Sequence, residues 1–300
     1  MYIIIFMQFQ ISYYFIFLVK FIFLYNIQAL VNIHSYSFLF QYILYFCGMF
    51  GITAGYHRLF THKSYDAHPL FRYLLILFGT STLEGSVIDW CSTHRMHHIY
   101  DGNDIDLNPY PIEKGLLHAH FFWIKGNYLT KKYNELLNNT IQKMSNNEWK
   151  NDIHIINHQH KYYYIYGPSF TIIFPILFEY YLLNSPFNYS IAITLLRTII
   201  VWHSTWAINS LAHYVGDKPY DKEISAINNH ICSIIAFGEG YHNYHHRFPK
   251  DYKASLNLNC FNITAHILTF LAQFNIVYNR KYILKKDVYD KSKTEYNILK

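Results

Sequence analysis

Histidines recur with one spacing in two short stretches of the chain. WCSTHRMHH at 90–98 contains His94, His97 and His98, and GEGYHNYHH at 238–246 contains His242, His245 and His246. Residues at i, i+3 and i+4 lie on one face of a helix, so each stretch would project three imidazoles in one direction. Imidazole is a common ligand of zinc, copper, iron and nickel, and three of them approach a complete coordination shell.

A third cluster, His57 and His62, lies in HRLFTH, and His213 in NSLAH is a ninth candidate ligand. His57 and His62 are five residues apart, about 140° around an ideal helix, which predicts that they do not share a helical face. We therefore expect one of them to end a helix and the other to lie beyond it. Asn209 stands one helical turn before His213.

Nine neutral imidazoles exceed what one metal ion can bind, so the pattern predicts two metals. A structural zinc site would be closed by four ligands and would favour thiolates, whereas thiolates and carboxylates are absent at ligand spacing here. Redox-active iron accepts imidazole, and two irons with open positions could react with dioxygen. An apolar tunnel leading to them would suit an unactivated C–H bond on a lipid chain.

The elements that must position these histidines are predicted to be membrane helices. Of the 300 residues, 20% are aromatic and only 15% are charged, which is typical of a membrane protein rather than a soluble domain. A span needs about 20 mostly apolar residues. Four stretches qualify, approximately 11–30, 37–56, 168–183 and 191–209. A fifth, 70–83, is short and turns polar at its end, so we expect it to be re-entrant or to lie on the surface.

Four spans would place every histidine cluster on one side of the membrane. The segments 57–72, 95–162 and 213–300 contain nearly all the Lys and Arg residues, which indicates that they are cytosolic, together with both termini. The net charge of +6 is then an orientation signal and an attraction to membrane lipid, and does not indicate nucleic-acid binding.

The predicted fold is therefore an all-α integral membrane protein with two helical hairpins under a helical cytosolic cap that holds a dimetal centre. One domain would span 1–300, with the cap made of 57–165 and 210–285. A tail, 286–300, would follow, and the charged stretch 280–300 is expected to be mobile.

The stretches HRLFTH, WCSTHRMHH, NSLAH and GEGYHNYHHRFPKDY closely resemble those of the membrane acyl-CoA desaturases of the delta-9 (stearoyl-CoA) type. The likeness runs from about 38 to 252. The last two stretches together are highly specific, whereas HxxxxH or HxxHH alone would also admit sterol oxidases and lipid hydroxylases. The resemblance implies an endoplasmic-reticulum oxidoreductase of unsaturated fatty acid biosynthesis. It would convert palmitoyl- or stearoyl-CoA to the cis alkene with dioxygen and two electrons at a diiron centre.

The resemblance also implies roles for single residues. The two irons would be ligated by His57, His62, His94, His97, His98, His213, His242, His245 and His246, with Asn209 holding a metal-bound water. Trp90, Thr205 and Trp206 match residues around the bend of the family's acyl tunnel. Cytochrome b5, with its reductase, is the usual electron donor, and because no His-Pro-Gly-Gly segment is present it is expected as a separate partner.

Chain-length selection is a further hypothesis. Met49 lies two helical turns before His57, so both should face the same interior side, and Met49 with Tyr45 would close the far end of the acyl tunnel. Two alternatives to an acyl-CoA desaturase remain open at this stage. One is a diiron hydroxylase or a desaturase of a different lipid, and the other is a non-catalytic membrane protein that binds metal or senses lipid.

Overall fold

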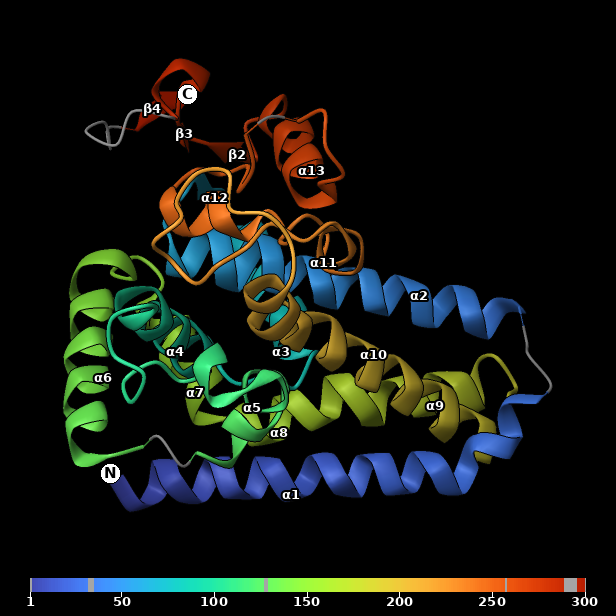
Figure 1. The fold of residues 1–300 in the computed structure, drawn as a ribbon. Coiled ribbons are helices and arrows are strands. Elements are labelled where there is room, and N and C mark those ends of the chain that lie inside the picture. The colour runs from blue at the N-terminus through green and yellow to red at the C-terminus, as the bar shows by residue number, and fades with distance from the viewer. Residues whose placement is uncertain (1, 32–34, 127–128, 257, 289–295, 300) are drawn as a thin grey trace.

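The structure is a computed structural model that describes residues 2–31, 35–126, 129–256, 258–288 and 296–299. Helices dominate it (Figure 1). The α-helices are α1 Tyr2–Asn26, α2 Ser35–Phe50, α3 Pro69–Thr80, α4 Val87–Tyr100, α5 Leu116–His120, α6 Lys131–Lys143, α7 Ile153–Lys161, α8 Tyr163–Pro168, α9 Phe174–Tyr181, α10 Phe187–Tyr214, α11 His230–Ile235, α12 His242–Arg247 and α13 Ile263–Ala272.

Shorter helical segments and strands join them. The π-helices are η2 Gly51–Thr61, η5 Met144–Glu148 and η6 Ser169–Ile173. The 3-10 helices are η1 Ile27–Val31, η3 Ile112–Lys114, η4 Phe122–Lys125 and η7 Lys285–Asp287. The strands are β1 Asp66–Ala67, β2 Val277–Tyr278, β3 Arg280–Tyr282 and β4 Asn297–Leu299.

Three helical stretches among the described residues are long and apolar enough to cross a membrane: Tyr13–Val31, Ser35–Thr61 and Phe187–Tyr214. They correspond to the first, second and fourth predicted spans. The second and fourth continue five residues past their predicted ends, because His57 and His213 are buried in the protein and the helix does not need to stop where the apolar pattern stops.

The third predicted span, 168–183, corresponds to a helical run from Tyr163 to Tyr181 that changes from α8 through η6 to α9. Pro175 has no N–H to donate to the carbonyl of Thr171, four residues earlier, and the Arg197 guanidinium on α10 donates to that carbonyl instead. The proline and the π segment explain why this run is not a single long α-helix.

The long helix α10 is the centre of the bundle, since it packs against α1, α2, α5 and α9 (Figure 1). A buried polar network also joins α2, α9 and the start of α10. The Glu179 carboxylate accepts from Ser37 Oγ at 2.6 Å and from Gln41 Nε2 at 3.1 Å. On α1, Tyr14, Phe17, Phe21 and Leu24 are exposed, as suits a lipid-facing helix.

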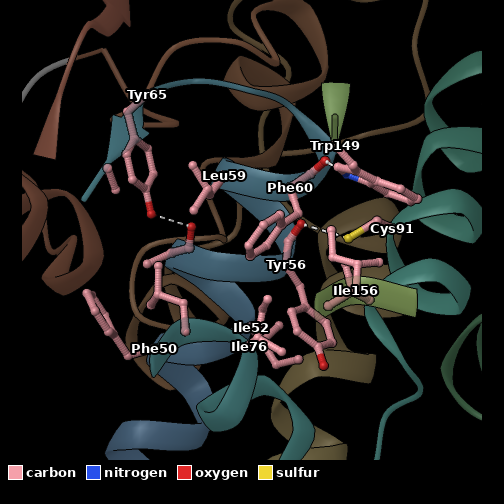
Figure 2. Packing of buried hydrophobic residues seen from close by; sticks show 14 of the residues in the cluster. Phe50, Ile52, Tyr56, Leu59, Phe60, Tyr65, Ile76, Cys91, Trp149 and Ile156 are labelled. Atoms are coloured by element: carbon pink, nitrogen blue, oxygen red, sulfur yellow. Dashed lines mark hydrogen bonds between the residues drawn. The ribbon is translucent and has the colours of Figure 1, made fainter. Parts of the chain in front are cut away.

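The π-helix η2 runs through the largest apolar core (Figure 2). It packs closely on α3 because Gly51 and Gly79, at the contact, have no side chains. A Cβ atom on Gly51 would lie only 2.2 Å from the Gly79 nitrogen. Side chains of the surrounding core donate to its carbonyls: Tyr65 Oη to Ala54 O at 2.7 Å and Trp149 Nε1 to Phe60 O at 2.9 Å. These bonds stabilise the π-helix, a helix type that is rare overall but occurs often at functional sites.

The fifth apolar stretch, predicted at 70–83, forms α3, which at 12 residues is shorter than a span. The C-terminal part of the cap pairs back onto the segment after His62, because β2 pairs antiparallel with β1. Within the stretch 280–300, which is expected to be mobile, residues 280–282 and 297–299 pair as β3 and β4, and the mobility stays a prediction. The rest of the predicted tail lies partly outside the described residues, at 289–295 and 300.

Candidate metal centre

The nine predicted histidines lie together in two groups, which we call the five-histidine group and the four-histidine group. Within each group, one ring nitrogen of every member lies within 4.8 Å of the others. The five-histidine group consists of His57, His62, His94, His98 and His245. The four-histidine group consists of His97, His213, His242 and His246.

The helices α4 and α12 each contribute to both groups. His94 and His98 are one turn apart and their Nε2 atoms lie 3.2 Å apart, while His97 points to the other group, with Nε2 3.2 Å from that of His246. On α12, His245 Nε2 lies 2.8 Å from His57 Nε2, in the five-histidine group. The i, i+3, i+4 spacing therefore divides each triplet between two neighbouring sites.

The expectation that His57 and His62 cannot share a helical face is wrong. It assumed α-helical geometry, whereas Gly51–Thr61 is a π-helix with i→i+5 hydrogen bonding, and His62 N donates to His57 O at 3.1 Å. A spacing of five residues is close to one turn of such a helix. The two ring centroids lie 4.9 Å apart, and both side chains enter the five-histidine group.

In three of these rings, Nδ1 points to an oxygen of a protein side chain. His57 Nδ1 lies 2.9 Å from Glu239 Oε2 and His246 Nδ1 lies 3.3 Å from Asp101 Oδ2. His97 Nδ1 lies 2.9 Å from the side-chain oxygen of Asn108. A ring that donates from Nδ1 keeps a lone pair on Nε2, and this arrangement is typical of metal-binding histidines.

The rings fit metal binding in two further respects. Burial, followed by the neighbouring rings, lowers the pKa of His62, His94, His98, His242 and His245 well below 6.5, so they are neutral at pH 7. Burial also lowers the pKa of His97 to about 4. The buried Nε2 atoms of His62 and His213 have no hydrogen-bond partner among the described residues, as expected for atoms aimed at a cation.

Two buried carboxylates beside the groups were not identified from the sequence. Burial opposes the charge of Asp101, but its hydrogen bond with His246 and the nearby His213 outweigh that effect and hold its pKa well below the usual range. Burial likewise raises the pKa of Glu239, but the positive charge of Arg58 has the larger effect together with His57, so the net shift lowers the pKa of Glu239. Each carboxylate lies three residues from a predicted ligand, Asp101 after His98 and Glu239 before His242, which is the only local signal of their role.

An apolar pocket opens onto both groups. Its wall includes His57 and His94 of the five-histidine group and His242 of the four-histidine group, together with Asn209. Apolar side chains of its wall include Phe15, Ile16, Leu83, Ile124 and Trp202, and α1, α4, α8 and α10 all contribute lining residues. Trp90, Thr205 and Trp206, the predicted bend residues, also line it.

Met49 and Tyr45 are not part of this lining. Met49 is fully buried in an adjoining apolar cluster with Val201 and Phe237, against which Ile208 of the pocket wall also packs. Tyr45 Oη donates to Ile235 O at 2.9 Å. The assignment of these two residues to the end of an acyl tunnel stays a prediction.

The chain is similar to known fatty acid desaturases. Residues 7–256 match the family model described as fatty acid desaturase. Acyl-CoA desaturase 1 of Saccharomyces cerevisiae is 34% identical over 253 residues, which cover 84% of this chain and 47% of that protein. The chain thus spans about half the length of the yeast relative.

Two animal relatives are matched over more of their length. A delta(9)-fatty-acid desaturase of Caenorhabditis elegans is 35% identical over 81% of this chain and 70% of its own length. Stearoyl-CoA desaturase 2 of Rattus norvegicus is 34% identical over 88% of this chain and 72% of its own length. With the histidine groups and the apolar pocket beside them, these matches show that the chain belongs to the fatty acid desaturase family.

Proposed function

We propose that the chain is an acyl-CoA delta-9 desaturase with a diiron centre. Family membership makes it an oxidoreductase that acts on fatty acyl chains. The observation that carries the finer proposal is the apolar pocket that opens onto both histidine groups. A saturated acyl chain has no polar group to recognise, so a pocket walled by aromatic and aliphatic side chains is the environment that binds it.

The reaction balances as CH2–CH2 + O2 + 2 e⁻ + 2 H⁺ → CH=CH + 2 H2O. Two irons, if bound by the nine histidines, would supply the oxidising chemistry with dioxygen. The protein's own side chains bind and orient the substrate. The apolar wall of the pocket excludes water, and Trp90 and Thr205 shape the path of the acyl chain. Asp101 and Glu239 fix the orientation of His246 and His57. Asn209 lies in the pocket wall, where it could hold a water between the metals and the substrate.

The electrons are proposed to come from cytochrome b5 with its reductase, and the site is proposed to face the cytosol from the endoplasmic-reticulum membrane. The names of the relatives support acyl-CoA as the substrate. The basic residues of the cap support the cytosolic orientation.

The experiment is complementation of a desaturase-deficient yeast that requires oleate. We expect growth without oleate and the appearance of delta-9 monoenes among the fatty-acid methyl esters, read by mass spectrometry. His97→Ala should abolish both, because a truncated ligand leaves one metal underligated. A matched control is His154→Ala, which removes an exposed histidine that belongs to neither group.

Other products would contradict the proposal in distinct ways. Hydroxylated fatty acids would identify a hydroxylase, since both reactions begin by removing one hydrogen. Inserted protein that binds iron but forms no new product, with a matched electron donor supplied, would favour a lipid sensor. New unsaturation in lipids other than acyl-CoA would identify a desaturase of a different substrate.

A further inference from the structure

A carboxyl group lies in the wall of the apolar pocket and has no role in the mechanism above. Glu84 lines the pocket between α3 and α4, together with Trp90 on α4 and Thr205 on α10. Trp90 Nε1 donates to Glu84 Oε2 at 3.4 Å, and Glu84 Oε1 lies 2.9 Å from Thr205 Oγ1. Glu84 thus joins the two sides of the pocket.

The backbone is built to present this side chain. Leu83 has a φ of 60° and Gly85 a φ of 109°, so a residue in the left-handed region stands immediately before Glu84. Trp202 Nε1 donates to Thr82 O at 2.8 Å, and Gly85 N donates to Tyr163 Oη at 2.8 Å. Donors and acceptors from α8 and α10 therefore hold the turn on both sides of Glu84.

The hydrogen-bond pattern favours an uncharged acid. Thr205 has one hydroxyl hydrogen, and the Trp202 carbonyl, at 2.9 Å, can accept it. A protonated Glu84 can then donate to Thr205 Oγ1 and accept from Trp90 with its other oxygen, which satisfies every group. An ionised Glu84 would place a charge among apolar side chains, and no Lys or Arg in the described part of the chain forms an ion pair with it.

We propose that Glu84 is a positioning residue that holds Trp90 and Thr205 as an uncharged acid, so that the pocket takes an apolar chain only while Glu84 is protonated. This inference rests on the proposed function, because the occupant is taken to be an acyl chain. Burial raises the pKa of Glu84 to about 8. An acid is uncharged below its pKa, so acyl binding is retained at pH 7 and lost as the pH rises through 8.

Other titratable groups share the pocket wall and must be separated from Glu84. They are Asp89 and His94 on α4, His57 on η2, Tyr163 and Tyr164 on α8, Tyr110, Glu239, and His242 on α12. Glu239 is paired with Arg58. Asp89 accepts from Ser86 Oγ at 2.6 Å and lies 3.5 Å from His160. Asp89 is therefore the matched control, a carboxylate in the same wall with partners of its own.

The test measures binding of palmitoyl-CoA to the purified full chain in detergent at pH 7 and pH 9. For an acid of pKa about 8, the protonated fraction falls about tenfold between these values, and the Kd of the wild type should rise by about that factor. Glu84→Gln is neutral at both pH values and keeps a donor and an acceptor, so its Kd should be about the same at pH 9 and at pH 7. Asp89→Asn should keep the roughly tenfold rise in Kd that is expected of the wild type. An equal ratio in wild type and Glu84→Gln would overturn the proposal.

Thermal melting tests the same group without a ligand. The raised pKa means that the folded state binds the Glu84 proton more tightly than the unfolded state, so the contribution of Glu84 to the stability of the wild type falls between about pH 4.5 and 8. The Tm difference between Glu84→Gln and wild type should therefore grow from pH 6 to pH 8. Melting curves with this pattern but no palmitoyl-CoA binding would refute the proposed substrate and leave the uncharged acid standing.

Discussion

At the scale of single residues, each histidine group has its own buried carboxylate. Asp101 contacts His246 and lies 3.9 Å from His213 Nδ1, both in the four-histidine group, and it accepts a hydrogen bond from Ser225. Glu239 contacts His57 of the five-histidine group. The two proposed metal sites can therefore be perturbed one at a time without removing a ligand.

Asp101→Asn is expected to weaken metal binding at the four-histidine group alone. Loss of a carboxylate behind a ligating histidine typically costs about 10–100-fold in metal affinity. Purified protein should then retain close to one iron per chain after dialysis against a weak chelator, where the wild type retains two. Asp104→Asn is the control, since Asp104 pairs with Lys132 at the surface. Equal iron content in the two variants would contradict a role for Asp101.

Met49→Ala tests the chain-length hypothesis. Met49 packs in the cluster that adjoins Ile208 of the pocket wall, so its removal would extend the pocket by part of a side chain. We expect the ratio of palmitate to stearate products to shift toward stearate. Met144→Ala, a buried methionine in a different core cluster, controls for loss of stability. An unchanged product ratio in Met49→Ala would exclude Met49 as the end of the tunnel.

At the scale of elements, the sequence predicted the helices that hold the histidines but not their geometry. The i, i+3, i+4 spacing correctly predicts helices at His94–His98 and His242–His246. The π-helix could not be predicted, because the donors to its carbonyls come from residues distant in sequence, such as Trp149, 89 residues beyond Phe60. The division of each triplet between two groups likewise depends on how α4 and α12 approach each other.

The crossing of η2 and α3 predicts a strict requirement for glycine at 51. A Cβ atom there would lie 2.2 Å from the Gly79 backbone, which cannot move without shifting α3. Gly51→Ala should therefore destabilise the protein by about 1–3 kcal/mol. In Gly48→Ala the new atom would meet a Thr82 methyl group at 3.1 Å, so the loss should be smaller. Melting temperatures in detergent compare the two, and equal values would show that the crossing can relax.

At the scale of the whole molecule, the histidine groups constrain the membrane topology. Each group combines histidines that precede residue 100 with histidines that follow residue 210, so both parts of the chain must lie on one side of the membrane. If α10 crosses the membrane, the chain must cross once more between them. The run Tyr163–Tyr181, whose far end lies beside the start of α10 (Figure 1), is the segment in position to do so.

Four spans therefore predict a definite glycosylation pattern. Acceptor sequons inserted singly at 183–185, in the loop 103–106 and in the loop 217–223 report the side of each segment, because only lumenal acceptors are modified. The chain already contains acceptor sequons at 138–140, 188–190 and 262–264, so each insertion is compared with the protein without it. We expect additional modification only for the insertion at 183–185. Three spans would instead leave 183–185 unmodified and glycosylate 217–223, which would separate His242, His245 and His246 from His94, His97 and His98 by a bilayer. A gel shift for each protein with an inserted sequon, measured with and without a glycosidase, decides between four spans and three. Only the arrangement with four spans can bring both histidine groups together.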